Sequence, residues 1–375
     1  MVSKSERARV WIEEILSPAG ISINGHNPWD LRIINEGFFE RVLKEGSLGF
    51  GEAYMDGWWE CEQIDEFFAR LMPTEPEMKL TNNLKLLLYL FGAVVLNPGR
   101  KSRAYQIGQR HYDIGNDLYR NMLDRRMTYS CGYWKDAASL DEAQEAKLDL
   151  ICRKLGLQPG QRVLDVGCGW GSFAKYAAER YGVEVLGITV SKEQVNLGRE
   201  LCEGLPVEIR FMDYRDVEGC FDHIVSVGMF EHVGYKNYPT YMKKVHECLK
   251  DDGLFLLHSI GSKTSRISRD PWYNKYIFPN SMIPSTKQIS AAAEGLFVME
   301  DFHNFGFYYY PTLMSWFGNF DRNWDKLKGR YDDRFYRMWK YYLLSFAGVF
   351  KSRHQQVWQM IFSRKGVPGG YASIR

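Results

Sequence analysis

The chain has 375 residues, with 48 Lys and Arg against 46 Asp and Glu and a formal net charge of +2. This near-balance gives no electrostatic reason to expect nucleic-acid binding, and the length allows one large domain with a smaller one. Seven cysteines without a CxxC pair and a start unlike a signal peptide predict free thiols in the cytoplasm, and we predict no metal site.

The longest apolar run in the first part of the chain covers residues 86–96, and Arg100, Lys101 and Arg103 follow it. The run is too short to cross a bilayer, which takes about 20 apolar residues. A basic cluster beside an apolar surface can rest on an anionic membrane. An ordinary buried helix that ends in a solvated linker would give the same pattern, so both interpretations stay open.

A glycine-rich turn with the sequence D-V-G-C-G-W-G follows the apolar stretch 163–166. Alternate glycines allow a tight strand-to-helix turn and bring backbone N–H groups close to a ligand. The spacing G-x-G-x-G differs from the dinucleotide fingerprint G-x-G-x-x-G, and it is similar to the S-adenosylmethionine loop of Rossmann-like methyltransferases. We predict that Asp165, Gly167, Gly169 and Gly171 form a cofactor loop; the alternative is a turn that binds no ligand.

Polar residues also follow the next two predicted strands. Thr189, Ser191 and Gln194 stand where a nucleoside-binding sheet usually has an acidic residue for the ribose, and hydroxyl and amide groups can take that role. Ser191 equally fits the N-cap of the following helix. The next strand ends in the sequence D-Y-R-D, which starts at Asp213. This carboxylate could accept from the amine of adenine or lie in a charged surface turn.

From residue 163 onward, strand and helix patterns alternate as a parallel sheet requires. We expect strands at residues 163–166, 183–188, 207–212, 223–227, 254–260, 297–302 and 357–362. Helices are expected near residues 173–181, 194–201 and 238–249. The predicted fold is α/β, a Rossmann-like methyltransferase with a smaller N-terminal domain. The expected divisions are a lipid- or membrane-binding domain (1–95), a linker (96–110) and a catalytic domain (111–375) with an aromatic insertion (261–296).

Groups able to do acid–base chemistry fall at the expected carboxyl ends of the strands. Glu231 and His232 follow the fourth strand, His258 lies at the end of the fifth, and Cys131 precedes the sheet. A histidine at a strand end or a cysteine among aromatic residues is often only part of the core. Glu231 is the strongest candidate because carboxylates are rarely buried unless they are paired.

An ordered set of motifs over nearly the whole chain resembles the cyclopropane fatty acid synthases. The motifs are residues 45–49, 54–59, 111–119, 129–134, 165–171, 189–194, 213–216, 227–234, 257–261, 276–280 and 303–306. The bacterial, phospholipid-acting branch is the most similar, because the shorter mycolic acid cyclopropane synthases lack the first unit.

The resemblance implies transfer of a methylene carbon from S-adenosylmethionine to a cis double bond of an unsaturated phospholipid acyl chain, through a carbocation that loses its proton to a bound bicarbonate ion. The bicarbonate site falls on Cys131, Glu231, His258, the backbone of Ile260, and Tyr309. The cofactor residues are Tyr129, Ser130, Asp165, Gly167, Gly169, Gly171, Thr189, Gln194, Asp213 and Tyr214. The resemblance further implies transient contact with the inner leaflet of the cytoplasmic membrane, and we expect a homodimer.

Two features depart from the family pattern or depend on the alignment. Phe346 occupies a position where many members have a cysteine, so a thiol there cannot be essential to this protein. The choice of Tyr309 among three adjacent tyrosines depends on a gapless alignment from His303. The alternatives to ring formation are a related fatty-acyl or small-molecule methyltransferase without ring closure, and a non-catalytic lipid-binding protein on the same fold.

Overall fold

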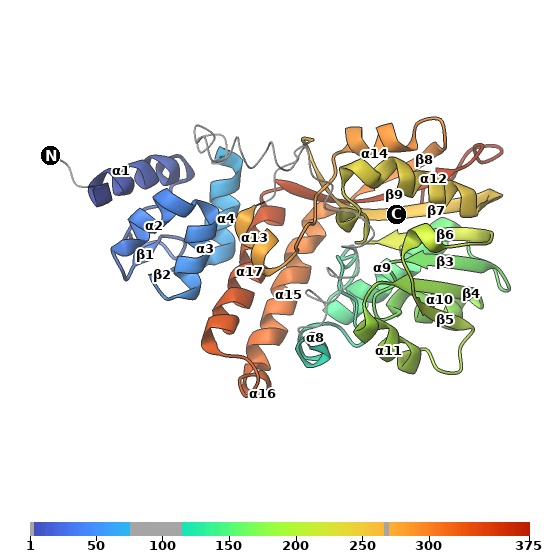
Figure 1. Ribbon diagram of the computed structural model, residues 1–375, viewed down its shortest axis with the longest axis horizontal. Helices are drawn as coiled ribbons and strands as arrows, with labels where there is room; N and C mark the ends of the chain where they lie inside the picture. Colours follow the sequence, from blue (N-terminus) through green and yellow to red (C-terminus); the bar gives the residue numbers. More distant parts are fainter. Residues whose placement is uncertain (1–3, 76–114, 266–269) are drawn as a thin grey trace. The chain divides into compact units, whose positions relative to one another are not determined.

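The computed structural model describes residues 4–75, 115–265 and 270–375 (Figure 1). Contacts group the chain into two units. Unit 1 takes its described residues from Met1–Leu96, Ile267–Pro279 and Tyr309–Gln355, and unit 2 takes them from Asn97–Arg266, Asn280–Tyr308 and Gln356–Arg375. This grouping differs from the linear division at residue 95, since the aromatic insertion is shared between the units and 309–355 joins the N-terminal helices.

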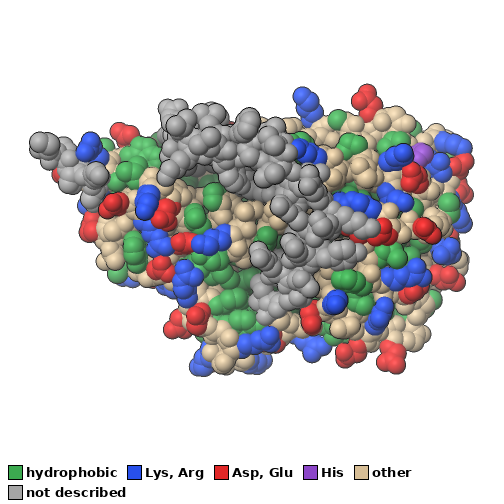
Figure 2. Space-filling view, in the orientation of Figure 1, with side chains coloured by type: hydrophobic (Ala, Val, Ile, Leu, Met, Phe, Trp, Pro, Cys, Tyr) green, Lys and Arg blue, Asp and Glu red, His purple; other side chains and the backbone are tan. Residues whose placement is uncertain are grey.

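The predicted linker 96–110 and the basic residues Arg100, Lys101 and Arg103 lie outside the described residues, as does the apolar run 86–96. No helix in the described part of the chain is long and apolar enough to cross a membrane. On the face seen in Figure 2, acidic and basic side chains are interspersed over the coloured surface.

Unit 2 is built on a seven-stranded sheet in the order β5-β4-β3-β6-β7-β9-β8. Its strands are β3 (Arg162–Val166), β4 (Glu184–Thr189), β5 (Val207–Phe211), β6 (Phe221–Val227), β7 (Leu249–Ser262), β8 (Val298–Asn304) and β9 (Gln355–Ser363). The pairs among β5, β4, β3, β6 and β7 are parallel, and β8 pairs with β9 in the antiparallel sense. The chain order reverses between β3 and β6, which is where such sheets bind ligands. The predicted α/β, Rossmann-like sheet is confirmed.

Helices cover both faces of this sheet (Figure 1). The unit contains α8 (Asn116–Met122), α9 (Leu140–Leu155), α10 (Ser172–Tyr181), α11 (Lys192–Leu201), α12 (Tyr238–Cys248) and α14 (Thr286–Ala293), with 3-10 turns η3 (Tyr214–Asp216), η4 (Phe230–His232), η5 (Tyr235–Asn237) and η6 (Gly306–Tyr308). Helices α9, α11 and α14 start after Ser139, Ser191 and Ser285, whose side chains accept a backbone N–H of the first turn.

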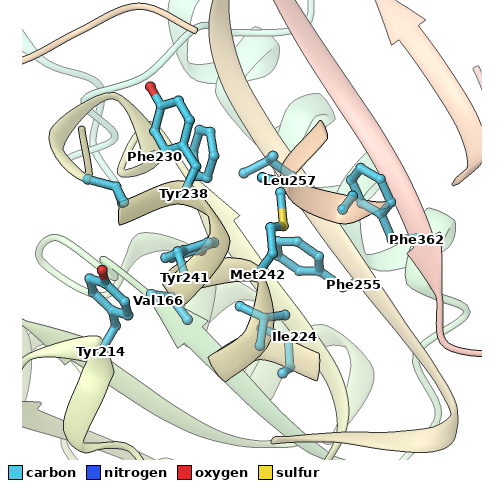
Figure 3. Close-up of a cluster of buried hydrophobic side chains, with 14 of the residues drawn as sticks. Val166, Tyr214, Ile224, Phe230, Tyr238, Tyr241, Met242, Phe255, Leu257 and Phe362 are labelled. Atoms are coloured by element: carbon cyan, nitrogen blue, oxygen red, sulfur yellow. The ribbon is translucent and has the colours of Figure 1, made fainter. Parts of the chain in front are cut away.

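Alternation along the strands divides the core into two layers. Val163 and Val225 pack with α9 and α10, whereas Ile224 and Phe255 pack with α12 and α14. Figure 3 shows the second layer, in which Met242 of α12 lies against the sheet among aromatic side chains. These two layers hold the strand ends, and therefore the loops that follow them, in fixed positions.

Unit 1 is mainly helical. Its helices are α1 (Lys4–Leu16), α2 (Gly37–Glu45), α3 (Ser47–Met55), α4 (Ile64–Leu71), α13 (Pro271–Tyr276), α15 (Tyr309–Arg322), α16 (Trp324–Leu327) and α17 (Asp333–Lys351), with 3-10 turns η1 (Ser17–Ala19) and η2 (Met72–Thr74). The short strands β1 (Arg32–Ile33) and β2 (Trp59–Glu60) form an antiparallel pair. Helix α17 packs against both α4 and α15.

Close packing and ion pairs join the separated segments of unit 1. A Cβ on Gly348 of α17 would overlap the carbonyl oxygen of Asp65 in α4, and one on Gly51 of α3 would overlap the ring of Trp272 in α13. Trp272 is buried and packs edge-on against Tyr341, with ring centroids 4.6 Å apart. This tryptophan of the aromatic insertion is therefore part of the core of unit 1.

Glu52 ties α3 to α13 and α2. Its Oε1 accepts from Lys275 Nζ at 2.6 Å and from the Tyr276 hydroxyl at 2.7 Å, and its Oε2 lies 2.8 Å from Arg41 Nη2. Burial opposes ionisation, but these hydrogen bonds lower the pKa of Glu52 to about 2. The carboxylate is therefore charged at neutral pH and holds three helices together.

Candidate functional site

A cavity lies at the carboxyl ends of β3, β4, β5 and β6, within unit 2. This is the position that the reversal of strand order favours for a ligand. The predicted cofactor residues that line it are Tyr129, Ser130, Asp165, Gly167, Gly169, Thr189, Gln194, Asp213 and Tyr214. Gly171 is not among the lining residues.

The three glycines of the loop have different surroundings. All have positive φ, which favours glycine: +87° at Gly167, +56° at Gly169 and +82° at Gly171. A Cβ on Gly167 would lie 2.6 Å from Met229, and one on Gly171 would lie 2.9 Å from Ile209. A Cβ on Gly169 would meet nothing within 4 Å. Gly171 thus allows close packing on β5, while Gly169 leaves the cavity open.

The backbone N–H groups at the start of the loop are used within the protein. Gly167 N and Cys168 N both donate to Ile188 O, at 2.9 and 3.0 Å. These two bonds fix the turn onto the end of β4. Gly171 N also donates within the protein, to Cys168 O at 2.9 Å, so the expectation that the glycines present their N–H groups to a ligand is wrong for Gly167 and Gly171.

The loops after β4 and β5 are buried and well ordered by hydrogen bonds. Thr189 Oγ1 donates to Gln194 Oε1 at 2.6 Å, and Gln194 N donates to Ser191 Oγ at 3.3 Å. Ser191 is therefore the N-cap of α11. Asp213 is only 1% exposed and accepts from Arg215 Nη1 at 2.9 Å, so it lies in the cavity wall rather than in a surface turn.

The indole of Trp170 anchors the loop to α8. Its Nε1 donates to Asn116 Oδ1 at 3.0 Å, and its ring centroid lies 4.8 Å from that of Tyr119. Tyr119 in turn contacts Tyr129, with centroids 5.2 Å apart. Residues 115–119 of the predicted motif thus support the cavity wall, and residues 111–114 lie outside the described part of the chain.

Helix α9 contributes two buried polar residues that sequence reasoning missed. Gln144 Nε2 donates to Ser130 O, and Lys147 Nζ donates to Ser130 Oγ, both at 2.8 Å. Lys147 also lines the cavity. The sequence signal that could have revealed them is their position: Gln144 and Lys147 share a helix face with the apolar residues Ala143 and Ile151. All four are buried.

The buried side chains of Asp165 and Lys147 have opposite charges and influence each other's pKa. Burial raises the pKa of Asp165 to about 7, and the charge of Lys147 opposes this shift. Burial lowers the pKa of Lys147 to about 8, against the opposing influence of Asp124, Cys131 and Asp165. Each charge therefore partly compensates the cost of burying the other.

Glu231 and Ile260, two of the predicted bicarbonate-site residues, are in direct contact. Glu231 Oε1 accepts from Ile260 N at 2.6 Å, and the residue is 5% exposed. Its other oxygen, Oε2, is buried and has no hydrogen-bond partner among the described residues. Burial raises the pKa of Glu231 to about 7. A buried oxygen without a partner is costly, which marks this atom as a point where a ligand can bind.

His258 and Cys131 are also buried in unit 2. His258 is 2% exposed, and Gln359 Nε2 lies 3.3 Å from its Nδ1; with the amide as donor in this contact, the imidazole proton is on Nε2. Burial lowers the pKa of His258 well below its usual value, and the charges of Lys147 and Lys154 act in the same direction. The imidazole is therefore neutral. The Cys131 thiol donates to Gly132 O at 3.3 Å.

The three adjacent tyrosines lie in different surroundings. Tyr309 begins α15 in unit 1, and its ring stacks on Phe350 with centroids 4.5 Å apart. Tyr310 donates to Asp65 Oδ2 at 3.2 Å, also in unit 1. Tyr308 belongs to unit 2, where its ring lies 5.4 Å from that of Tyr133.

The position of the family cysteine is filled by an aromatic side chain. Phe346 packs in unit 1 edge-on against Tyr273, with centroids 4.5 Å apart, and it is buried. No thiol is present at this point of the chain, so any chemistry of this protein proceeds without one there.

Solved structures with this architecture include cyclopropane synthases and methyltransferases. The mycolic acid cyclopropane synthase CmaA1, in its crystal structure complexed with SAH and CTAB, matches with a TM-score of 0.64 and 32% identity over 69% of this chain and 97% of that chain. Coclaurine N-methyltransferase, also bound to SAH, matches with a TM-score of 0.68 over 84% of this chain and 98% of that chain, at 23% identity. The fold is that of the S-adenosylmethionine-dependent methyltransferases.

Sequence comparison narrows this class. The family model described as mycolic acid cyclopropane synthetase matches residues 99–360. The cyclopropane-fatty-acyl-phospholipid synthase of Escherichia coli (strain K12) is 54% identical over 362 residues, 96% of this chain and 94% of that protein. A tuberculostearic acid methyltransferase of Mycobacterium tuberculosis is 32% identical over 350 residues, 88% of this chain and 81% of that protein. The chain belongs to the mycolic acid cyclopropane synthetase family, which confirms the resemblance.

Proposed function

We propose that this protein transfers a methylene carbon from S-adenosylmethionine to the cis double bond of an unsaturated phospholipid acyl chain and forms a cyclopropane ring. The observation that carries the proposal is the 54% identity to the Escherichia coli cyclopropane-fatty-acyl-phospholipid synthase along 96% of the chain. The cavity at the strand ends supports it, because the predicted cofactor residues line that cavity.

The chemistry requires a dry site with a weak base. Transfer of the methyl group to an alkene leaves S-adenosylhomocysteine and a carbocation, which closes to the ring when the new methyl group loses a proton. Water would trap the cation, so the groups around it must exclude solvent. Glu231, His258 and Cys131 are all buried, which supports this role.

A bicarbonate ion fits these residues. The unpartnered Oε2 of Glu231 could accept from its hydroxyl group, and the proton on His258 Nε2 could be donated to one of its other oxygens. When bound, bicarbonate would supply the base that accepts the proton. Tyr309, which belongs to unit 1, stays a prediction from the resemblance.

The direct test incubates the purified protein with S-adenosylmethionine and vesicles of a mono-unsaturated phospholipid. We expect fatty acids heavier by one CH₂ group whose proton NMR spectrum shows ring protons and no alkene. The alternative, methylation without ring closure, has support from the tuberculostearic acid methyltransferase among the relatives. Loss of a proton from the carbocation without ring closure would give a methyl-branched alkene or a methylene-branched product, which would contradict ring formation.

We expect the rate to depend on bicarbonate. Degassed, carbonate-free buffer should lower turnover of the wild-type protein, and added bicarbonate should restore it, whereas the same concentration of chloride should not. The release of S-adenosylhomocysteine measures both. If rigorous removal leaves the rate unchanged, the ion is not the base, and His258 or Tyr309 becomes the candidate.

We further propose that the enzyme contacts the membrane surface only transiently, through residues near Arg100, Lys101 and Arg103. Each basic side chain near an anionic surface contributes on the order of 1 kcal/mol, and salt screens it. Replacing all three by Glu should reduce co-sedimentation with anionic vesicles at low salt and leave cofactor binding intact. Undiminished sedimentation of this variant would place the contact elsewhere, with the Trp58–Trp59 region as the next candidate.

A further inference from the structure

The hydroxyl group of Ser130 accepts a hydrogen bond from a side chain of α9. Lys147 Nζ donates to Ser130 Oγ at 2.8 Å, and Gln144, one turn earlier on the helix, donates to the carbonyl oxygen of the same residue. Because the hydroxyl oxygen accepts from the ammonium group, its own O–H must point to another acceptor. Among the described residues, no acceptor for this O–H is found within the protein, and Ser130 lines the cavity.

Lys147 has unused donors at the same place. An ammonium group carries three N–H donors, and Ser130 is its one hydrogen-bond partner in the described part of the chain. Lys147 is 1% exposed and lines the cavity beside Ser130. A buried cation with spare donors is costly unless an anion completes it.

The charges in the cavity indicate the kind of anion. Asp165, 2% exposed, lines the same cavity, so a buried carboxylate and a buried ammonium group both border the space. An α-amino acid carries the complementary pair, a carboxylate beside an ammonium group. Burial lowers the pKa of Lys147 and raises that of Asp165, and the charge of each group opposes the shift of the other.

We propose that Lys147 is a positioning residue that orients the Ser130 hydroxyl toward the carboxylate of the cofactor's amino-acid part and supplies the positive charge that this carboxylate needs. The inference rests on the proposed cofactor, S-adenosylmethionine, and it is independent of the lipid substrate.

Lys154 provides a matched comparison on the same helix. It lies seven residues further along α9 and is also buried, but its partners are inside the protein: His303 Nδ1 at 3.1 Å and Asp301 Oδ2 at 3.8 Å. It is not among the residues that line the cavity. A lysine-to-methionine change at either position removes a buried ammonium group from α9, but of the two only Lys147 lines the cavity.

The experiment measures binding of two ligands by calorimetry. S-adenosylhomocysteine carries the amino-acid carboxylate, and 5′-methylthioadenosine lacks it. Lys147→Met should weaken binding of S-adenosylhomocysteine by about ten- to a hundredfold, as expected for loss of a charge-assisted hydrogen bond, and should leave 5′-methylthioadenosine nearly unchanged. Lys154→Met should bind both ligands as the wild type does.

Ser130→Ala keeps the proposal testable if Lys147→Met fails to fold. It should show the same selective loss, and the double variant should lose less binding free energy than the sum of the two single losses, because Lys147 acts partly through that hydroxyl. Equal weakening of both ligands in Lys147→Met, or wild-type affinity of Ser130→Ala for S-adenosylhomocysteine, would overturn the proposal. Selective loss in a protein that makes no cyclopropane product would refute the proposed reaction and leave this inference standing.

Discussion

Glu231→Gln is expected to lower turnover by roughly a hundredfold or more and to leave S-adenosylhomocysteine binding close to that of the wild type. The amide can keep the 2.6 Å bond from Ile260 N through its oxygen, so the local backbone should stay in place. What changes is Oε2, the buried oxygen without a partner, which becomes an N–H donor. The atom that should accept the hydroxyl hydrogen of the proposed anion would then carry N–H groups, and these would repel that hydroxyl group. Steady-state kinetics and calorimetry measure the two effects separately.

Glu300→Gln is the matched control for this change. Glu300 Oε1 likewise accepts from a backbone N–H, that of Val367, at 2.8 Å, and the residue is on β8 away from the cavity. Its variant should keep wild-type turnover. If Glu231→Gln turned over as fast as Glu300→Gln, Glu231 would have no part in the chemistry. Isolation of a covalent adduct on Glu231 would also contradict its role as a residue that organises the base.

Gly169→Val should weaken cofactor binding by at least tenfold. Gly169 has φ +56°, where a β-branched residue is strained, and its Cβ would project into open space in the wall of the cavity. The valine side chain would therefore occupy volume that the ligand needs, in addition to straining the turn. Calorimetry with S-adenosylhomocysteine measures the loss directly.

Gly204→Val separates the steric effect from backbone strain. Gly204 has φ +79°, its Cβ also meets nothing within 4 Å, and it is exposed in a turn before β5. Both variants should lose some stability, but only Gly169→Val should lose affinity. Wild-type affinity of Gly169→Val would mean that the cofactor does not approach this loop.

The alternation of strands and helices was readable from the sequence because buried parallel strands are apolar runs of short, regular length. The prediction for β7 began five residues late. The strand starts at Leu249, and its first part contains Lys250, Asp251 and Asp252, which are exposed. Their place in the sheet comes from pairing with β6 across a register shift, which no hydropathy pattern reveals.

Some residues of the candidate site could likewise be predicted from the sequence, and others could not. Residues such as Asp165, Thr189 and Asp213 could be predicted because they lie at the carboxyl ends of strands or just beyond them, and these ends meet at one edge of the sheet. Lys147 and Gln144 come from a helix that precedes the sheet. Their contact with Ser130 is tertiary, and a lysine on a helix is normally exposed. The spacing between them shows that they share a face but not what that face touches.

The joining of unit 1 from separated segments has a consequence for how the protein folds as it is made. Lys351 Nζ of α17 contacts Glu66 Oε2 of α4 at 2.7 Å, although 285 residues separate them. At a synthesis rate of about 5–20 residues per second, α4 waits on the order of tens of seconds for its partner. During that interval Phe68, whose ring later packs against Tyr341 of α17 with centroids 5.7 Å apart, has no native partner from that helix. We therefore expect the first helices to expose apolar surface, and to benefit from chaperones, until synthesis reaches α17.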